Sequence, residues 1–89
     1  MLYMVIERFR GGDPLPVYAR FRKDGRLAPD GLRYAGSWVT SDLQRCYQLM
    51  ECDDEQFLLE WMRRWEDLVE FEYFSVITSA EASERVVAR

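Results

Sequence analysis

Four segments of the chain have the apolar pattern of β-strands, and two have the spacing of helices. In residues 2–9 both sides of an extended chain are apolar, with Leu2, Met4 and Ile6 on one side and Tyr3, Val5 and Phe9 on the other. A strand with two apolar faces is typical of a central position, covered on both sides. Gly11 and Gly12 then end the segment.

The next segment has helix-start signals. Asp13 is a suitable N-cap, and Pro14 fits the first helical position because its missing N–H would be unpaired there. Leu15, Tyr18 and Phe21 follow at helical spacing and predict a narrow apolar stripe. We expect this helix to end at Gly25, or to continue to the turn at residues 29–31.

Residues 32–40 and 43–52 predict a β-hairpin whose turn is centred on Ser41 and Asp42. This turn would place Trp38 opposite Arg45 and Gly36 opposite Tyr47. One face of the hairpin is then aromatic with a charged fringe. The other carries smaller residues, as expected beneath helices: Ala35, Ser37, Val39, Cys46 and Met50.

The C-terminal part predicts a helix, a strand and a short helix. Asp53 and Asp54 can cap the first helix, whose wide apolar stripe consists of Phe57, Leu58, Trp61, Met62 and Trp65. Residues 68–77 alternate as a strand, and glutamates on one of its faces suit an edge position. Thr78 and Glu81 form a capping-box pattern that opens the last helix.

The predicted order is β-α-β-β-α-β with a short C-terminal helix, in one domain spanning residues 1–89. Right-handed crossovers give this α+β chain a ferredoxin-like antiparallel sheet of order 4-1-3-2, with both main helices on one face. The uncovered aromatic face favours a symmetric homodimer, a dimeric α/β barrel, because an exposed apolar patch is a liability in a monomer. Its dimer-interface candidates are Tyr34, Trp38, Arg45, Tyr47 and Leu49.

Composition excludes several functions. The net charge of −4 and the dispersed basic residues argue against a nucleic-acid partner, and the third predicted strand lacks the basic-aromatic pattern of RNA-binding sheets. The chain has no histidine, which removes His-dependent catalysis and imidazole ligation. The apolar N-terminal run is too short for a signal peptide or a membrane span, so we expect a cytoplasmic protein with no membrane partner.

The two cysteines suggest packing more than redox chemistry. On one intact strand Cys46 and Cys52 would be roughly 20 Å apart, too far for a disulfide or for a shared metal ion. Helix capping accounts for Asp53 and Asp54 without a carboxylate metal site. We therefore expect no metal and no cofactor.

A ligand pocket between the sheet and the helices is the remaining candidate site, with Ser37, Gln48 and Arg33 as its candidate residues. Gln48 lies among apolar residues, so its amide either ties down backbone or points into the pocket. Trp38 with Arg45 could clamp a ligand or form a cation–π pair at the dimer rim. Glu7 and Arg8 could be a buried catalytic pair or a surface ion pair.

The motifs MLYMVIERF, GLRYAGSWV and RCYQLMECDD, with the Trp61/Trp65 pair and FEYFSVITSAEA, resemble a small bacterial family of unknown function. That family is similar to the dimeric α/β-barrel superfamily, which includes cofactor-independent monooxygenases and isomerases; its haem-degrading members need a histidine that this chain lacks. Three functions follow as hypotheses. They are a homodimeric protein that binds a small hydrophobic or aromatic molecule, a cofactor-independent enzyme acting on such a molecule, and a protein-interaction module using the open sheet face.

Overall fold

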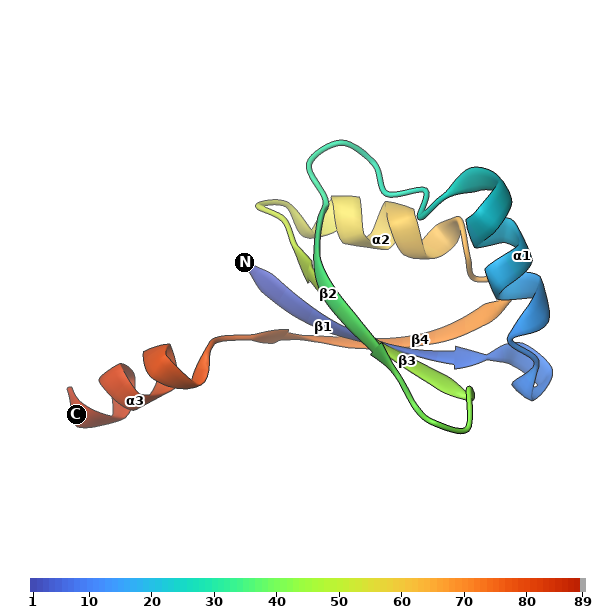
Figure 1. The fold of residues 1–89 in the computed structure, drawn as a ribbon. Coiled ribbons are helices and arrows are strands. Elements are labelled where there is room, and N and C mark those ends of the chain that lie inside the picture. Colours follow the sequence, from blue (N-terminus) through green and yellow to red (C-terminus); the bar gives the residue numbers. More distant parts are fainter. Residues whose placement is uncertain (89) are drawn as a thin grey trace.

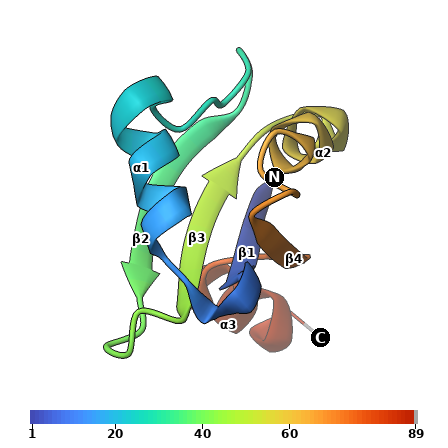
Figure 2. The same ribbon diagram turned by 90° about the vertical axis from the view of Figure 1, so that its right-hand side faces the viewer.

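A single antiparallel sheet organises the computed structural model, which describes residues 1–88. Its strands are β1 (Leu2–Phe9), β2 (Arg33–Val39), β3 (Arg45–Glu51) and β4 (Val69–Val76), in the order β2-β3-β1-β4. Helices α1 (Leu15–Asp24) and α2 (Glu55–Arg63) cover one face, α1 on the β2–β3 side and α2 on the β1–β4 side (Figures 1 and 2). The predicted ferredoxin-like α+β fold and sheet order are confirmed.

Helix ends follow the predicted capping signals. The Asp54 carboxylate accepts the N–H of Gln56 at 2.9 Å at the start of α2. Gly25 ends α1 with φ +74°, and its N–H donates to the carbonyl of Phe21. After β1, a short 3-10 helix, η1 (Arg10–Gly12), separates the strand from α1, and the Asp13 carboxylate accepts the N–H of Leu15. The apolar stripe predicted for α1 is wrong in part, because Val17 is its buried residue and Leu15 is exposed.

The helix-facing side of the sheet forms the core with α2. Alternate residues of β1 and β3 point to this side, and Leu58 and Trp61 of α2 pack against them. The opposite side, which we call the outer face, has no covering layer within residues 1–88 (Figure 1). Helix α3 (Ser79–Val87), capped by Thr78, extends beyond β4 away from the two other helices and buries none of its residues.

The β2–β3 turn is longer than predicted. Four residues, 41–44, connect Thr40 to Arg45, and Leu43 adopts φ +62°. The usual two-residue turns need positive φ at the first central position or at both, and Ser41 does not favour this conformation. The longer turn moves the register by two residues, so that Trp38 lies opposite Tyr47. Because strand faces alternate with period two, the predicted faces survive this shift near the turn.

A β-bulge at residue 35 changes the faces farther along β2. Gly36 pairs with Leu49 and Tyr34 pairs with Met50, which leaves Ala35 as an extra residue on β2. Tyr34 therefore points to the helix side with Met50, and Arg33 points to the outer face. The aromatic ring over Gly36 is that of Trp38, 3.3 Å from where a Cβ would stand, and not that of Tyr47.

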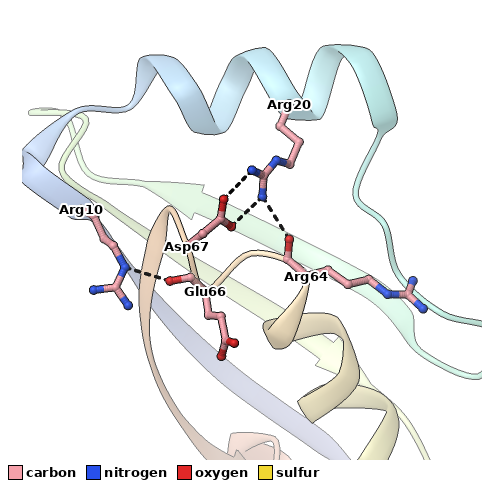
Figure 3. A network of polar contacts seen from close by, with 5 residues as sticks. All are labelled: Arg10, Arg20, Arg64, Glu66 and Asp67. Atoms are coloured by element: carbon pink, nitrogen blue, oxygen red, sulfur yellow. Dashed lines mark hydrogen bonds and ion pairs between the residues drawn. The ribbon is translucent and has the colours of Figure 1, made fainter.

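Polar contacts fix α1 to the segment between α2 and β4. The Arg20 guanidinium of α1 donates bidentate hydrogen bonds to the Asp67 carboxylate at 2.6 and 2.8 Å, and it also donates to the carbonyl of Arg64 (Figure 3). Arg10 donates to the carbonyl of Glu66 at 2.8 Å. These contacts hold α1 beside the C-terminal end of α2, where the two helices border a cavity.

Candidate ligand-binding cavity

A cavity of about 250 Å³ lies between the helix-facing side of the sheet, α1 and α2. Three of the four strands, β1, β2 and β3, contribute to it, and most of its walls are apolar or aromatic. It is lined by Glu7, Phe9, Val17, Tyr18, Phe21, Arg26, Ser37, Val39, Cys46, Gln48, Trp61 and Trp65. Tyr18, Phe21 and Val39 are each partly exposed, so this apolar wall reaches solvent between α1 and β2.

Three polar side chains form a hydrogen-bonded set along the cavity. The Gln48 amide donates from Nε2 to Oε2 of Glu7 at 2.6 Å, and its Oε1 accepts from Nε of Arg26 at 2.6 Å. Glu7 and Gln48 are 6% and 5% exposed, so two polar side chains are buried against an otherwise apolar core. Because an ionised carboxylate only accepts and a guanidinium only donates, the orientation of the Gln48 amide is fixed by its neighbours.

Arg26 is held at both its backbone and its side chain. Its carbonyl oxygen accepts the indole N–H groups of Trp61 at 3.0 Å and Trp65 at 2.9 Å. Its guanidinium lies 3.7 Å from the ring centroid of Tyr34 and 5.1 Å from that of Phe21. Cation–π contacts of this kind and the bond to Gln48 position the guanidinium at the cavity wall.

Burial shifts the pKa values of two side chains that line the cavity, Glu7 and Cys46. It raises the pKa of Glu7, although hydrogen bonds from Gln48 and Cys46 and the charge of Arg26 oppose this rise. Burial, with the nearby Glu7 carboxylate, raises the pKa of Cys46 to about 12. Cys46 is therefore a neutral thiol at physiological pH and a poor nucleophile. Glu7 is the carboxyl group of the cavity, and burial opposes its ionisation.

The predicted pocket residues are only partly brought together. Ser37 and Gln48 line the cavity. Arg33 does not, because the bulge turns it to the outer face, where its Nε donates to Glu51 at 3.0 Å. The bulge also turns Tyr34, expected at the dimer interface, toward the helices, where its hydroxyl contacts that of Ser37 at 2.7 Å. The one signal for this bulge in the sequence is Gly36, which directly follows Ala35, because a glycine inside a strand often marks a bulge.

The other dimer-interface candidates share the outer face. Trp38 pairs with Tyr47, and Leu49 lies two residues farther along β3. Arg45 lies opposite Arg8 of β1, so the suggested pairing of Trp38 with Arg45 is wrong. Trp38 is 60% exposed in the monomer.

Glu7 and Arg26 are the polar cavity residues that sequence reasoning did not place in a pocket. Glu7 and Arg8 point to opposite faces of β1: Glu7 is buried, and Arg8 is 3.6 Å from Glu72 on the outer face. A signal for Glu7 existed, since it occupies an inward position of a strand whose other inward residues are apolar. Arg26 lies in an irregular loop after α1 and has no such periodicity.

Residues 1–88 contain no group of three potential metal-ligating His, Cys, Asp or Glu side chains. Cys46 and Cys52 are both buried and unbridged. Across the same residues, no helix has the length and apolar character needed to cross a membrane.

A family model matches residues 1–89, the whole chain. The chain belongs to the family described as domain of unknown function DUF3303. The predicted resemblance to such a family is confirmed. A crystal structure of a protein from Agrobacterium tumefaciens is similar to this chain with a TM-score of 0.47 and 13% sequence identity. The match covers 89% of this chain and 96% of that one. No curated protein matches the chain.

Proposed function

We propose that this DUF3303 chain is a homodimeric protein that binds a small hydrophobic or aromatic molecule in the cavity beneath α1. The observation that carries the proposal is the hydrogen-bonded set of Glu7, Gln48 and Arg26 in a cavity with aromatic walls. Burying polar and charged groups costs free energy, and apolar side chains would fill the same space more stably. Apolar walls with a few convergent polar groups are typical of small-molecule sites.

The size of the cavity supports a compact ligand. An apolar protein cavity of about 150 Å³ can hold benzene. The cavity here, at about 250 Å³, is larger than that and below the usual range for drug-sized ligands, which begins at about 300 Å³. A molecule of one or two rings fits these limits.

Binding is tested by the indole N–H resonances of ¹⁵N-labelled protein during titration with one- and two-ring aromatic compounds. Trp61 and Trp65 line the cavity, and Trp38 lies on the opposite face of the sheet, so it serves as a control within the molecule. We expect the first two resonances to move and that of Trp38 to stay. The partly exposed Val39 offers a matched variant, V39W, whose larger ring would block the mouth and abolish these shifts. Equal movement of all three indoles, or of none, would contradict the proposal.

The homodimer part of the proposal is supported by the outer face. Neighbouring strands there carry apolar residues side by side: Leu49 lies opposite Met4, which lies opposite Phe74 of β4. Charged pairs border this region, including Arg8 with Glu72 and Arg33 with Glu51. An apolar centre with a polar rim is the usual organisation of a protein interface.

Light scattering tests the assembly. We expect a particle of twice the 10.6 kDa chain mass at micromolar concentration. Trp38→Lys should give a folded monomer, because the side chain is exposed in the single chain. Leu15→Lys, an exposed leucine on α1, should leave the dimer intact. A monomeric wild-type protein would refute the dimer and favour a different protein as the partner of the outer face.

A second candidate function is a cofactor-independent isomerase in which Glu7 removes a proton from the bound molecule. The observation that favours it is a buried carboxylate whose pKa burial raises, as for a general base. Proton exchange of 2-tetralone in D2O, followed by ¹H NMR, tests this. The wild type should exchange its C1 protons faster than buffer and faster than E7Q; equal rates would refute catalysis.

A further inference from the structure

The two oxygens of Glu7 are in different situations. Oε2 accepts the hydrogen bond from Gln48, whereas no N–H or O–H donor of residues 1–88 reaches Oε1, and the other group beside the carboxylate is the thiol of Cys46. No fully buried side-chain oxygen of these residues lacks a partner. Oε1 is therefore accessible from the cavity that Glu7 lines, and it is the strongest free acceptor there.

The neighbours of Glu7 cannot turn to satisfy Oε1. Both ends of the Gln48 amide are engaged, with its nitrogen on Glu7 and its oxygen on Arg26. Cys46 offers only a thiol, which is a weak donor. A bound molecule with an O–H or N–H group would supply the missing donor.

The charges of the cavity restrict the ligand further. The Glu7 carboxylate would repel a carboxylate ligand. Arg26 would repel an ammonium ligand, and its guanidinium already lies over the ring of Phe21, one of the aromatic side chains that line the cavity. Gln48 joins the negative Glu7 to the positive Arg26, so these cavity side chains have no net charge. This balance favours a neutral ligand.

We propose that Glu7 is the recognition group of the cavity and that the ligand is a neutral aromatic molecule donating a hydrogen bond, such as an aromatic alcohol or an N–H heterocycle. Its ring lies among Phe9, Tyr18, Trp61 and Trp65, and its donor reaches Oε1 of Glu7. This inference rests on the proposed ligand-binding function. It adds the chemical class of the ligand and the residue that selects it.

A matched series of compounds tests the inference: 2-naphthol, 2-methoxynaphthalene and 2-naphthoate, each titrated while the indole resonances are recorded. In 2-methoxynaphthalene the donor is replaced by an ether of similar shape. A hydrogen bond to a charged group contributes about 1.5–3 kcal/mol. We therefore expect 2-naphthol to bind wild type at least about tenfold more tightly than 2-methoxynaphthalene, and 2-naphthoate to bind most weakly.

The variant E7Q gives the sharper result. Because Gln48 still presents N–H to position 7, the new amide must turn its oxygen to Gln48 and its NH2 group to the cavity. The preference for 2-naphthol over the ether should fall to about one, and 2-naphthoate should gain affinity beside the uncompensated Arg26. Glu72→Gln, the same change on the outer face, should leave all three affinities unchanged.

The outcomes separate the two proposals. If naphthol and its ether bind equally well to wild type and shift Trp61 and Trp65, the cavity binds ligands but Glu7 does not select them, and this inference is overturned alone. If none of the three compounds shifts either indole, the inference is overturned together with the evidence for an aromatic ligand. The wild-type series decides between these results without relying on any variant.

Discussion

The indole groups of Trp61 and Trp65 share one backbone acceptor at the cavity wall. This arrangement predicts that replacing both tryptophans has a non-additive effect on the free energy of unfolding. Trp61 and Trp65 are 1% and 4% exposed; Trp61 lies in α2 and Trp65 in the turn that follows it. Both donate to the carbonyl oxygen of Arg26. Replacing either residue by Phe removes one donor and leaves the oxygen with the other.

The cost of each single substitution follows from this geometry. One hydrogen bond contributes about 1 kcal/mol. Trp to Phe also removes about two buried carbon atoms, or roughly 1.5 kcal/mol of apolar burial. W61F and W65F should each lower the free energy of unfolding by about 2–3 kcal/mol. In W61F/W65F the carbonyl loses both donors, and leaving such a group unpaired costs a further 1–3 kcal/mol, roughly.

The double variant should therefore be destabilised by more than the sum of the single effects, by about 1–3 kcal/mol. Urea unfolding followed by circular dichroism measures all four proteins, provided that the m-value stays constant. Phe71, whose ring centroid is 5.8 Å from that of Trp61, supplies a control cycle with F71L. A simple packing contact is lost only once, so W61F/F71L should be less destabilised than the sum. Additivity of W61F and W65F within about 0.5 kcal/mol would refute the shared acceptor.

Three further predictions concern protonation, backbone and thiol reactivity. Burial raises the folded-state pKa of Glu7, so the wild-type protein loses stability as the pH rises from the unfolded-state pKa near 4.5 through the folded-state pKa. The stability of E7Q relative to wild type, measured by urea unfolding at several pH values, should therefore increase over that window. A stability difference that does not change with pH would refute the burial effect. Gly31 has φ +94°, and a Cβ there would be 2.9 Å from Phe57, so G31A should lose more than about 1 kcal/mol. Gly11, with φ +68° and open space around it, is the control. Equal losses of stability in G11A and G31A would show that the contact with Phe57 contributes nothing. Cys46, with a pKa of about 12, should react with iodoacetamide at pH 8 only after unfolding, and rapid labelling of the native protein by mass spectrometry would contradict its burial.

Local signals determined most of the fold, and this is why the sequence predicted it. The capping residues Asp54 and Thr78 act within one helical turn, and the alternation in β1 reports its two faces directly. The sheet order follows from connection rules that need only the order of elements. In the same way, the inward positions of Gln48 and Ser37 could be predicted from the strand pattern.

The missed parts of the site depend on interactions between distant residues. The bulge at Ala35 exchanges the faces of Arg33 and Tyr34, and its one sign in the sequence, Gly36, does not say how the register shifts. Arg26 reaches the cavity because two tryptophans 35 and 39 residues away bind its carbonyl oxygen. Neither interaction has a period or a motif. A pocket formed by an irregular loop on a bulged strand cannot be deduced from one chain's pattern alone.

The bulge also connects the two surfaces proposed to be functional. By turning Tyr34 inward, it places an aromatic ring beneath the guanidinium of Arg26, which in turn fixes Gln48 against Glu7. By turning Arg33 outward, it adds an ion pair with Glu51 to the charged border of the outer face. In a regular strand, Arg33 would compete with Arg26 for the buried acceptors and Tyr34 would join the apolar centre outside. One extra residue in β2 thus keeps a second arginine out of the cavity and adds one ion pair to the polar rim of the outer face.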